Sequence, residues 1–177
     1  MLELDNMAVD IIPPKPEYAA LFYKWRNEPI TLKFNPVKQR TQKELEEILR
    51  ISCVTLNPLD KTKSHRWFIR FNTEIVGTVS LSEINDMMGT AEIGYMVSES
   101  YHGRGIATAA LKKWTSMIFE LTDLRKLTAF VADKNLASIR VLEKVGYQKE
   151  GLLREHYLVQ NEPTTEVVFG LLRKEWI

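Results

Sequence analysis

The sequence has few of the residues on which crosslinks and metal centres depend. Its 177 residues include a single cysteine, Cys53, so no disulfide can form within the chain. The three histidines, His65, His102 and His156, are too scattered to suggest a set of metal ligands, and we expect no metal cofactor. No apolar run approaches the length of a membrane span, and the N-terminus has no basic-then-apolar signal pattern. These absences predict a cytoplasmic protein with no membrane partner.

The chain also has no excess of positive or negative charge. The chain has 24 basic and 23 acidic residues, which gives a formal net charge of +1. Nucleic-acid-binding modules usually have a high pI or a strongly basic face, so we expect no nucleic-acid partner. With 45% apolar and 27% charged residues, the composition is that of an ordinary globular protein. The length suits a single domain, residues 1–177, that is large enough to bury a hydrophobic core.

The hydrophobic pattern predicts alternating strands and helices. Short apolar runs and period-two alternation predict strands at 7–12, 65–71, 75–84, 92–97, 126–132, 147–159 and 164–174. Apolar residues at helical spacing predict helices at 17–27, 41–56, 104–121 and 135–145, whereas 30–40 has no regular pattern. The order predicts an α+β fold, with a mixed and mostly antiparallel sheet of about six to seven strands flanked by about four helices.

Local signals refine several of these elements. Thr41 and Glu44 have the spacing of a capping box at a helix N-terminus. Gly146 suits a helix C-terminus, and Gly77 within a strand indicates a bulge or the close approach of another backbone. Cys53 continues the helical spacing of the second predicted helix, so we expect it to pack as a small apolar residue.

The most informative segment joins the strand at 92–97 to the helix that follows it. Gly103-Arg104-Gly105 lies between them, and a helix that begins there has backbone N–H groups without an intrahelical partner. Glycines let an anion approach that backbone closely, and the helix dipole favours negative charge at this end. The segment predicts a pyrophosphate-binding turn, although ordinary turns share the Gly-x-Gly pattern. It is not a Walker loop, because no Gly-Lys-Ser/Thr follows, and the dinucleotide fingerprint fails at Thr108.

Residues 102–107, His-Gly-Arg-Gly-Ile-Ala, resemble the acyl-coenzyme A binding motif of the GNAT superfamily of N-acetyltransferases, whose pattern is Gln/Arg-x-x-Gly-x-Gly/Ala. His102 stands at the first position of the pattern, and both small positions are kept. The flanking sequence at 91–95, Ala-Glu-Ile-Gly-Tyr, and the segment 135–151 also resemble family motifs. The combination is most similar to the branch of the ribosomal-protein acetyltransferases RimJ and RimL.

The resemblance implies the GNAT fold and acetyl-coenzyme A as a co-substrate. It implies that the strand residues Met96, Val97 and Ser98 offer backbone groups to the pantetheine arm, and that Asn135 contacts the same arm. The residues that it implies for the pyrophosphate are His102, Gly103, Arg104, Gly105, Ile106, Ala107 and Thr108.

Acetyl transfer to an amine needs a group that removes a proton from the amine and one that stabilises the leaving thiolate. A Glu that matches Glu92 often serves as the base or orients a water in the family, and Glu83 on the neighbouring strand is the alternative. A solvent-facing or ion-paired carboxylate is an equal interpretation of Glu92. Ser138 matches a Ser that bonds the thiolate in related enzymes, and helix capping is the alternative for Asn135 and Ser138.

The acceptor site is the part of the sequence that is hardest to interpret. Trp25, Phe34 and Trp67 are candidates for its walls, with Glu83, and core packing is the alternative role of the aromatic residues. The RimJ/RimL-like sequence implies the N-terminal amine of a protein as the acceptor, and a small amine such as a polyamine, an amino acid or an aminoglycoside is the alternative. A non-catalytic acyl-coenzyme A sensor is a further hypothesis. Relatives often pair, so a homodimer is one expected state.

Overall fold

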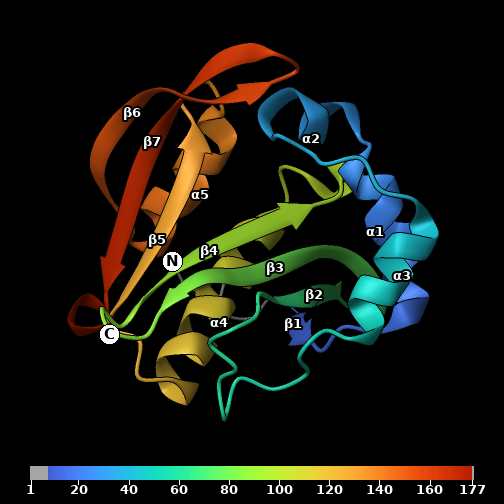
Figure 1. Cartoon of the computed structure of the whole chain (residues 1–177), viewed down its shortest axis with the longest axis horizontal. Coiled ribbons are helices and arrows are strands. Elements are labelled where there is room, and N and C mark those ends of the chain that lie inside the picture. The colour runs from blue at the N-terminus through green and yellow to red at the C-terminus, as the bar shows by residue number, and fades with distance from the viewer. Residues whose placement is uncertain (1–7, 177) are drawn as a thin grey trace.

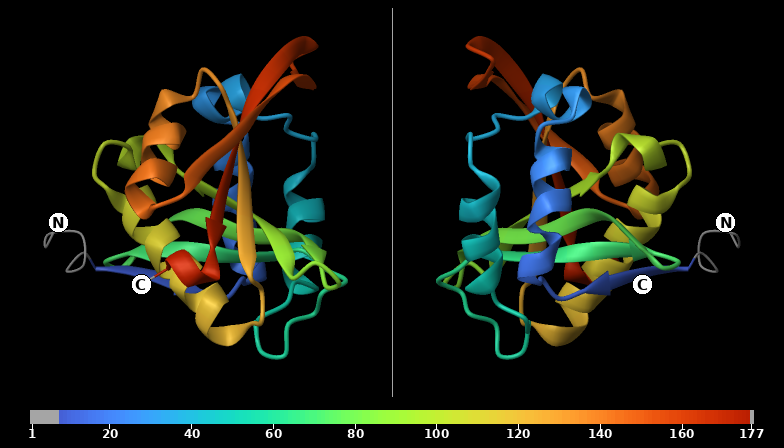
Figure 2. Two further views of the ribbon diagram at one scale, coloured as in Figure 1. Left: turned by 90° about the vertical axis from the view of Figure 1, so that its left-hand side faces the viewer. Right: turned by 90° about the vertical axis from the view of Figure 1, so that its right-hand side faces the viewer.

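The computed structural model describes residues 8–176, which form one mixed sheet with helices on both faces (Figures 1 and 2). The seven strands follow the order β1-β2-β3-β4-β5-β7-β6. Their bounds are β1 Val9–Ile12, β2 His65–Phe71, β3 Glu74–Asn85, β4 Thr90–Val97, β5 Lys126–Ala132, β6 Gln148–Val159 and β7 Glu162–Leu172. Every neighbouring pair is antiparallel except β4 and β5, which are parallel. The predicted α+β class with a mostly antiparallel sheet is confirmed.

Five α-helices connect the strands within residues 8–176. They are α1 Ala19–Arg26, α2 Pro29–Phe34, α3 Gln42–Arg50, α4 Ile106–Leu121 and α5 Leu136–Val145, and the short 3-10 helices are η1 Pro16–Tyr18, η2 Glu99–Tyr101 and η3 Arg173–Glu175. Figure 2 shows α4 and α5 on one face of the sheet and α1 and α3 on the other. The fold therefore has three layers, with the sheet in the middle.

Two hydrophobic clusters hold these layers together. The larger cluster fills the space between the sheet and α4 and contains Trp114, whose exposed fraction is 0%. The smaller cluster lies under α1 and α3 and contains Phe68, whose ring is 4.9 Å from the ring of Tyr18. Burial on both faces fixes the register of the central strands, because a shift by one residue would turn every side chain to the wrong face.

β4 and β5 pair only at one end. Their parallel register runs from Thr90 opposite Lys126 to Glu92 opposite Thr128, and the strands then part (Figure 1). β4 stays paired with β3 as far as Val97, so beyond Glu92 its other edge has no strand partner among the described residues. Backbone N–H and C=O groups inside a protein need hydrogen-bond partners. The free edge of β4 is therefore suited to an extended ligand that carries amide groups.

The second predicted helix is too long. The capping box of Thr41 and Glu44 is confirmed, but α3 ends at Arg50. The hydroxyl of Ser52 donates to the carbonyl of Ile48 at 2.7 Å, and this is the acceptor that the Ser52 N–H would use in a continuing helix. Serine competes with the backbone in this way, which explains the early end of the helix.

Cys53 consequently lies in a loop, and its predicted packing on a helix face is wrong. Its Sγ atom is 3.9 Å from the Asp60 carboxylate, and the side chain is partly buried. The segment 30–40, predicted to be irregular, begins inside α2, because Pro29 suits the first turn of a helix, where no N–H is needed. The predicted first strand began at Met7, which lies outside the described residues.

Candidate functional site

The turn before α4 forms a cradle of backbone N–H groups. Gly103 and Gly105 have φ of +74° and +78°, a left-handed conformation in which other residues are strained. Gly105 is the N-cap of α4, and within residues 8–176 no side chain caps this end and no acidic residue lies in the first turn. Ile106 and Thr108 are buried and Ala107 is partly buried, so these residues can meet a ligand mainly through their amides. The amides at this end of α4 are available to an anion, as the helix dipole favours.

The remaining residues of the turn support it or border it. The Nε2 atom of His102 donates to the carbonyl of Val97 at 2.8 Å, which ties the turn to the end of β4. Arg104 is exposed, and its guanidinium lies 5.4 Å from the centre of the Tyr101 ring. A Cβ at Gly103 would meet no atom within 4 Å, so the space in front of the turn is open.

At the end of β4, some backbone groups point towards β3 and others towards the free edge of the strand. The N–H of Ser98 donates to the carbonyl of Val76 in the segment of β3 beside it, at 2.8 Å. Because peptide groups alternate along a strand, those of Tyr95 and Val97 point to the free edge, where β5 has parted. Met96 packs its side chain against the smaller cluster instead. Of the three predicted pantetheine contacts, Val97 is therefore the one whose peptide group lies on the free edge.

Glu28 joins the first helices to this strand, a contact that no sequence pattern indicated. Its carboxylate accepts hydrogen bonds from the Ser98 hydroxyl at 2.7 Å and from the Glu99 N–H at 2.9 Å. Glu28 is the N-cap residue of α2, so the turn between α1 and α2 is held against the end of β4. The end of the predicted cofactor strand and the N-terminus of α2 are thus linked directly.

Glu92 lies on β4 at the last position before β4 and β5 part, opposite Ser82 on β3 and Thr128 on β5. Burial raises the pKa of its carboxyl above the usual value, and the charges of Glu83 and Glu166 raise it further. Glu83 is exposed and has φ of +46° at an irregular point of β3. Glu92 is thus the more enclosed of the two predicted bases, and a raised pKa makes a carboxylate a stronger base.

Ser138 lies in the first turn of α5 and contacts Tyr95, which was not among the predicted site residues. The Tyr95 hydroxyl is 2.6 Å from the Ser138 hydroxyl and 3.0 Å from its carbonyl oxygen. Burial raises the pKa of Tyr95 to about 12, so the phenol keeps its proton at neutral pH. The side chain of Asn135 caps α5 by accepting from the Ser138 N–H at 3.2 Å. In the sequence, Tyr95 is the last residue of the motif at 91–95 and an alternating position of the strand, and neither signal revealed this partner.

His156 and Glu166 form a second pair that the sequence did not suggest. The Nδ1 atom of His156 is 2.5 Å from a carboxylate oxygen of Glu166. Glu166 is buried and His156 is half-exposed, with its ring 6.1 Å from that of Phe130 on β5. The charge of Glu166 acts on Glu92, so the two groups share one electrostatic environment on this face of the sheet. An imidazole held by a carboxylate is a frequent arrangement for proton transfer.

The aromatic residues predicted for an acceptor wall are distributed differently. Trp25 is 2% exposed and lies in the smaller cluster, with its ring 6.4 Å from that of Phe68. Trp67 packs on Trp114 on the opposite face, with 5.8 Å between the ring centres. Phe34 is partly exposed at the end of α2. Burial thus favours core packing for Trp25 and Trp67, whereas Phe34 remains accessible.

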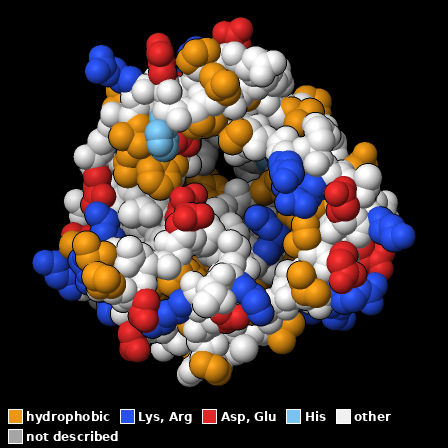
Figure 3. Space-filling model, viewed as in Figure 1, with side chains coloured by type: hydrophobic (Ala, Val, Ile, Leu, Met, Phe, Trp, Pro, Cys, Tyr) orange, Lys and Arg blue, Asp and Glu red, His pale blue; other side chains and the backbone are white. Residues whose placement is uncertain are grey.

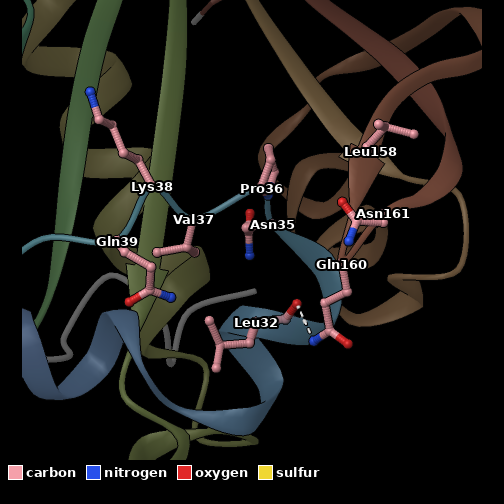
Figure 4. Close-up of a pocket in the computed structure, with 9 residues that line it drawn as sticks. All are labelled: Leu32, Asn35, Pro36, Val37, Lys38, Gln39, Leu158, Gln160 and Asn161. Carbon is pink, nitrogen blue, oxygen red and sulfur yellow. Dashed lines mark hydrogen bonds between the residues drawn. The ribbon is translucent and has the colours of Figure 1, made fainter.

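A pocket of about 430 Å³ lies between the segment after α2 and the β6–β7 hairpin (Figure 4). Val37 and Lys38 lie on one side of it and Leu158 on the other, and the Gln160 amide donates to the carbonyl of Leu32 at 3.2 Å. None of the predicted catalytic or cofactor residues lines this pocket.

No group of three or more His, Cys, Asp or Glu side chains is arranged to hold a metal ion within residues 8–176. No helix in the described residues is both long and apolar enough to cross a membrane.

Comparison with known proteins supports the resemblance seen in the sequence. The chain is 32% identical over 108 residues to the "Uncharacterized N-acetyltransferase p20" of Bacillus licheniformis, and the match spans 61% of each chain. It is 26% identical over 132 residues to the spermidine N(1)-acetyltransferase of Escherichia coli strain K12, a match that covers 75% of this chain and 71% of that protein. The p20 match thus spans about three fifths of that relative's length.

The fold has solved counterparts over nearly its whole length. The structure of RimL, a ribosomal L7/L12 alpha-N-protein acetyltransferase in complex with coenzyme A, matches with a TM-score of 0.83 at 16% identity. The match covers 97% of both chains, which confirms the predicted fold. The family model described as "Acetyltransferase (GNAT) domain" matches residues 9–148. This chain therefore belongs to the GNAT acetyltransferase domain family.

Proposed function

We propose that this protein is an acetyl-coenzyme A dependent N-acetyltransferase. The observation that carries the proposal is the uncapped N-terminus of α4, which Gly103 and Gly105 leave open and which His102 ties to the end of β4. The cradle suits the pyrophosphate of coenzyme A, and the free edge of β4 suits the amides of its pantetheine arm. Membership of the GNAT family and the coenzyme A in the RimL complex support the same co-substrate.

Bound acetyl-coenzyme A supplies a thioester, whose carbonyl carbon the amine attacks while the carbon–sulfur bond breaks. The protein has to handle one proton at each end of this exchange. We assign to Glu92 the proton that the acceptor ammonium must lose for its amine to attack, taken directly or through a water, and the raised pKa of Glu92 supports this role. We assign the hydroxyls of Ser138 and Tyr95 to the leaving sulfur, because they lie 2.6 Å apart and either can donate to a thiolate.

The acceptor that we propose is the N-terminal amine of a protein. The RimL neighbour is named as an enzyme of that kind and matches 97% of this chain. The face of the sheet that carries Glu92 is hollowed between the first helices, α1 and α2, and the strands β5–β7 (Figure 3). A polyamine acceptor is the alternative, and the spermidine N(1)-acetyltransferase of E. coli supports it.

The test is the release of coenzyme A thiol from acetyl-coenzyme A across a panel of acceptors. The panel holds N-terminal peptides, spermidine and spermine, free amino acids and aminoglycosides. Turnover of peptides alone is the expected result, and turnover of polyamines alone would replace the acceptor while leaving the chemistry in place. Binding of acetyl-coenzyme A without turnover of any acceptor would favour a sensor over an enzyme.

A further inference from the structure

Two arginines on the same face of the sheet as Glu92 have no acidic partner among residues 8–176. Arg66 on β2 is opposite Ser80, and Ser80 is opposite Gly94, two residues along β4 from Glu92. Directly opposed residues of a sheet share a face, and so do residues two apart on a strand. Arg66 therefore projects from the face on which the proposed base lies.

Within the described part of the chain, the Arg66 guanidinium makes one hydrogen bond, from Nη1 to the Thr78 hydroxyl at 3.1 Å. It lies 4.9 Å from the centre of the Phe22 ring, and the guanidinium of Arg26 lies 5.4 Å from the same centre. Arg26 in turn donates to the carbonyl of Lys38 at 2.7 Å. Among residues 8–176, no carboxylate lies within ion-pair distance of Arg26 or Arg66, so two positive charges share one aromatic ring without neutralisation.

This arrangement is unfavourable in the free protein. Burial, and after it the charge of Arg26, lowers the pKa of Arg66 to about 10. A partly buried cation normally has a carboxylate partner, because loss of water is otherwise uncompensated. Arg66 uses one of the five N–H donors of a guanidinium, and the others are suited to a carboxylate that accepts two parallel hydrogen bonds.

On the surface of this face, acidic and basic side chains lie in separate areas. In Figure 3, acidic side chains lie at the centre of the face, over β4 and β5, and basic side chains lie to their right over β3 and α1, beside a hollow. An acceptor bound here would have its ammonium at the acidic part and meet a basic part further along. A polyamine has a second positive charge, which the arginines would repel.

The spacing indicates where an acidic group would lie in the acceptor. β2 and β4 are separated by one strand, so Arg66 and β4 are about 10 Å apart at the usual strand spacing. An extended peptide advances about 3.3 Å per residue, so two to three residues cover that distance. The amine and carboxylate of a free α-amino acid are too close together to reach both groups.

We propose that Arg66 and Arg26 bind an acidic side chain at the second or third residue of the acceptor, so that the protein selects N-termini with Asp or Glu at those positions. This inference rests on the proposed function, since it assigns the substrate class of the same site. Arg66 is the main contact, and Arg26 contributes charge.

The test compares C-terminally amidated hexapeptides that differ in one residue. The matched pairs have Asp or Asn at the second position, or Asp or Asn at the third, and a peptide with Lys is a further comparison. We expect the acidic peptides to have a KM lower by roughly 10- to 100-fold, the usual effect of a charge-assisted hydrogen bond. Arg66→Gln should remove this difference in KM.

Arg70→Gln is the matched control, because Arg70 is on the same strand but is paired with Asp10 at 2.7 Å. It should keep the preference for acidic peptides. Equal KM values for Asp and Asn peptides, or a preference that survives Arg66→Gln, would overturn the inference. In either of those cases acetylation of the peptides would still stand, so the proposed function would be unaffected.

Two readouts do not depend on turnover. Calorimetry with coenzyme A present should give tighter binding of the Asp peptides to the wild type and not to Arg66→Gln. If no peptide is acetylated but this preference is found, the proposed function fails and the anion site stands. The melting temperature of Arg66→Gln should equal or exceed that of the wild type, whereas an arginine retained for structure would lower it when removed.

Discussion

At the residue scale, Gly105 has the most specific requirement in the site. Its φ of +78° and its position as the N-cap of α4 leave the helix amides open. Gly105→Glu should abolish binding of acetyl-coenzyme A, because it puts a carboxylate against the pyrophosphate and strains the turn. Isothermal calorimetry measures the loss. Leu121→Glu, at the exposed C-terminal end of the same helix, is the matched control and should bind normally.

The raised pKa of Glu92 predicts how kcat depends on pH. Its pKa is raised, by burial first and then by Glu83 and Glu166, so the group stays protonated to a higher pH than an ordinary glutamic acid. A protonated carboxyl cannot accept a proton, so kcat should fall as the pH decreases through this raised pKa. A pH–rate profile of Glu92→Gln should lack that acidic limb, with kcat lower by about 10²- to 10⁴-fold.

The raised pKa of Glu92 also determines the expected stability of Glu92→Gln. The folded protein binds the proton of Glu92 more tightly than the unfolded chain, so ionisation of Glu92 lowers the free energy of unfolding as the pH rises. Glu92→Gln should therefore be as stable as the wild type at neutral pH, or more stable. A large loss of stability together with unchanged kcat would assign Glu92 a structural role.

At the scale of elements, β3 and β4 approach each other closely at Gly77, which is one of the two alternatives that the sequence left open. A Cβ at this position would lie 2.1 Å from the carbonyl oxygen of Met96. Gly77→Ala should lower the free energy of unfolding by about 1–3 kcal/mol, since the two strands have to separate. It should also weaken the binding of acetyl-coenzyme A, because β4 leads into the cradle. Gly151→Ala, where a Cβ meets nothing within 4 Å, should change neither quantity.

The contact between α5 and β4 carries the second prediction at this scale. Ser138→Ala and Tyr95→Phe should each lower kcat while leaving the affinity for acetyl-coenzyme A nearly unchanged, if the pair acts on the leaving sulfur. The effects should not add in the double variant, because the two hydroxyls form one unit. Equal turnover of Ser138→Ala and the wild type would leave Ser138 with its role in the first turn of α5.

At the scale of the whole molecule, the proposed ligand site joins parts that are distant in the chain. The cradle, the free edge of β4 and α5 all belong to the layer on the larger cluster, so a ligand that bridges them should stabilise the fold as a unit. Acetyl-coenzyme A at 100 times its Kd should add about 2.7 kcal/mol, or roughly 5–10 °C in melting temperature for a chain of this size. Differential scanning calorimetry measures the shift, and Gly105→Glu should not show it.

Local features of the chain were predictable from the sequence. The capping box at Thr41, the C-terminal Gly146 of α5, the strands and the Gly-rich turn each depend on residues no more than a few positions apart. The helix that was predicted beyond Arg50 failed for a local reason too, since the Ser52 hydroxyl competes for a backbone carbonyl. The cradle could be identified because the conformation of glycine and the open end of a helix are properties of one short segment.

The sequence by itself thus determined the elements, the cradle and the family resemblance. Only the tertiary structure decided which side chains meet. Tyr95 and Ser138 are 43 positions apart, and Glu28 and Ser98 are 70 apart, and no local pattern encodes such pairs. The same holds for Arg66. Its surroundings, in which no carboxylate from residues 8–176 lies within ion-pair distance, depend on how α1 packs on β2. Strand order and the faces of the sheet are set by burial across the whole chain, and that long-range packing is what brings these groups together.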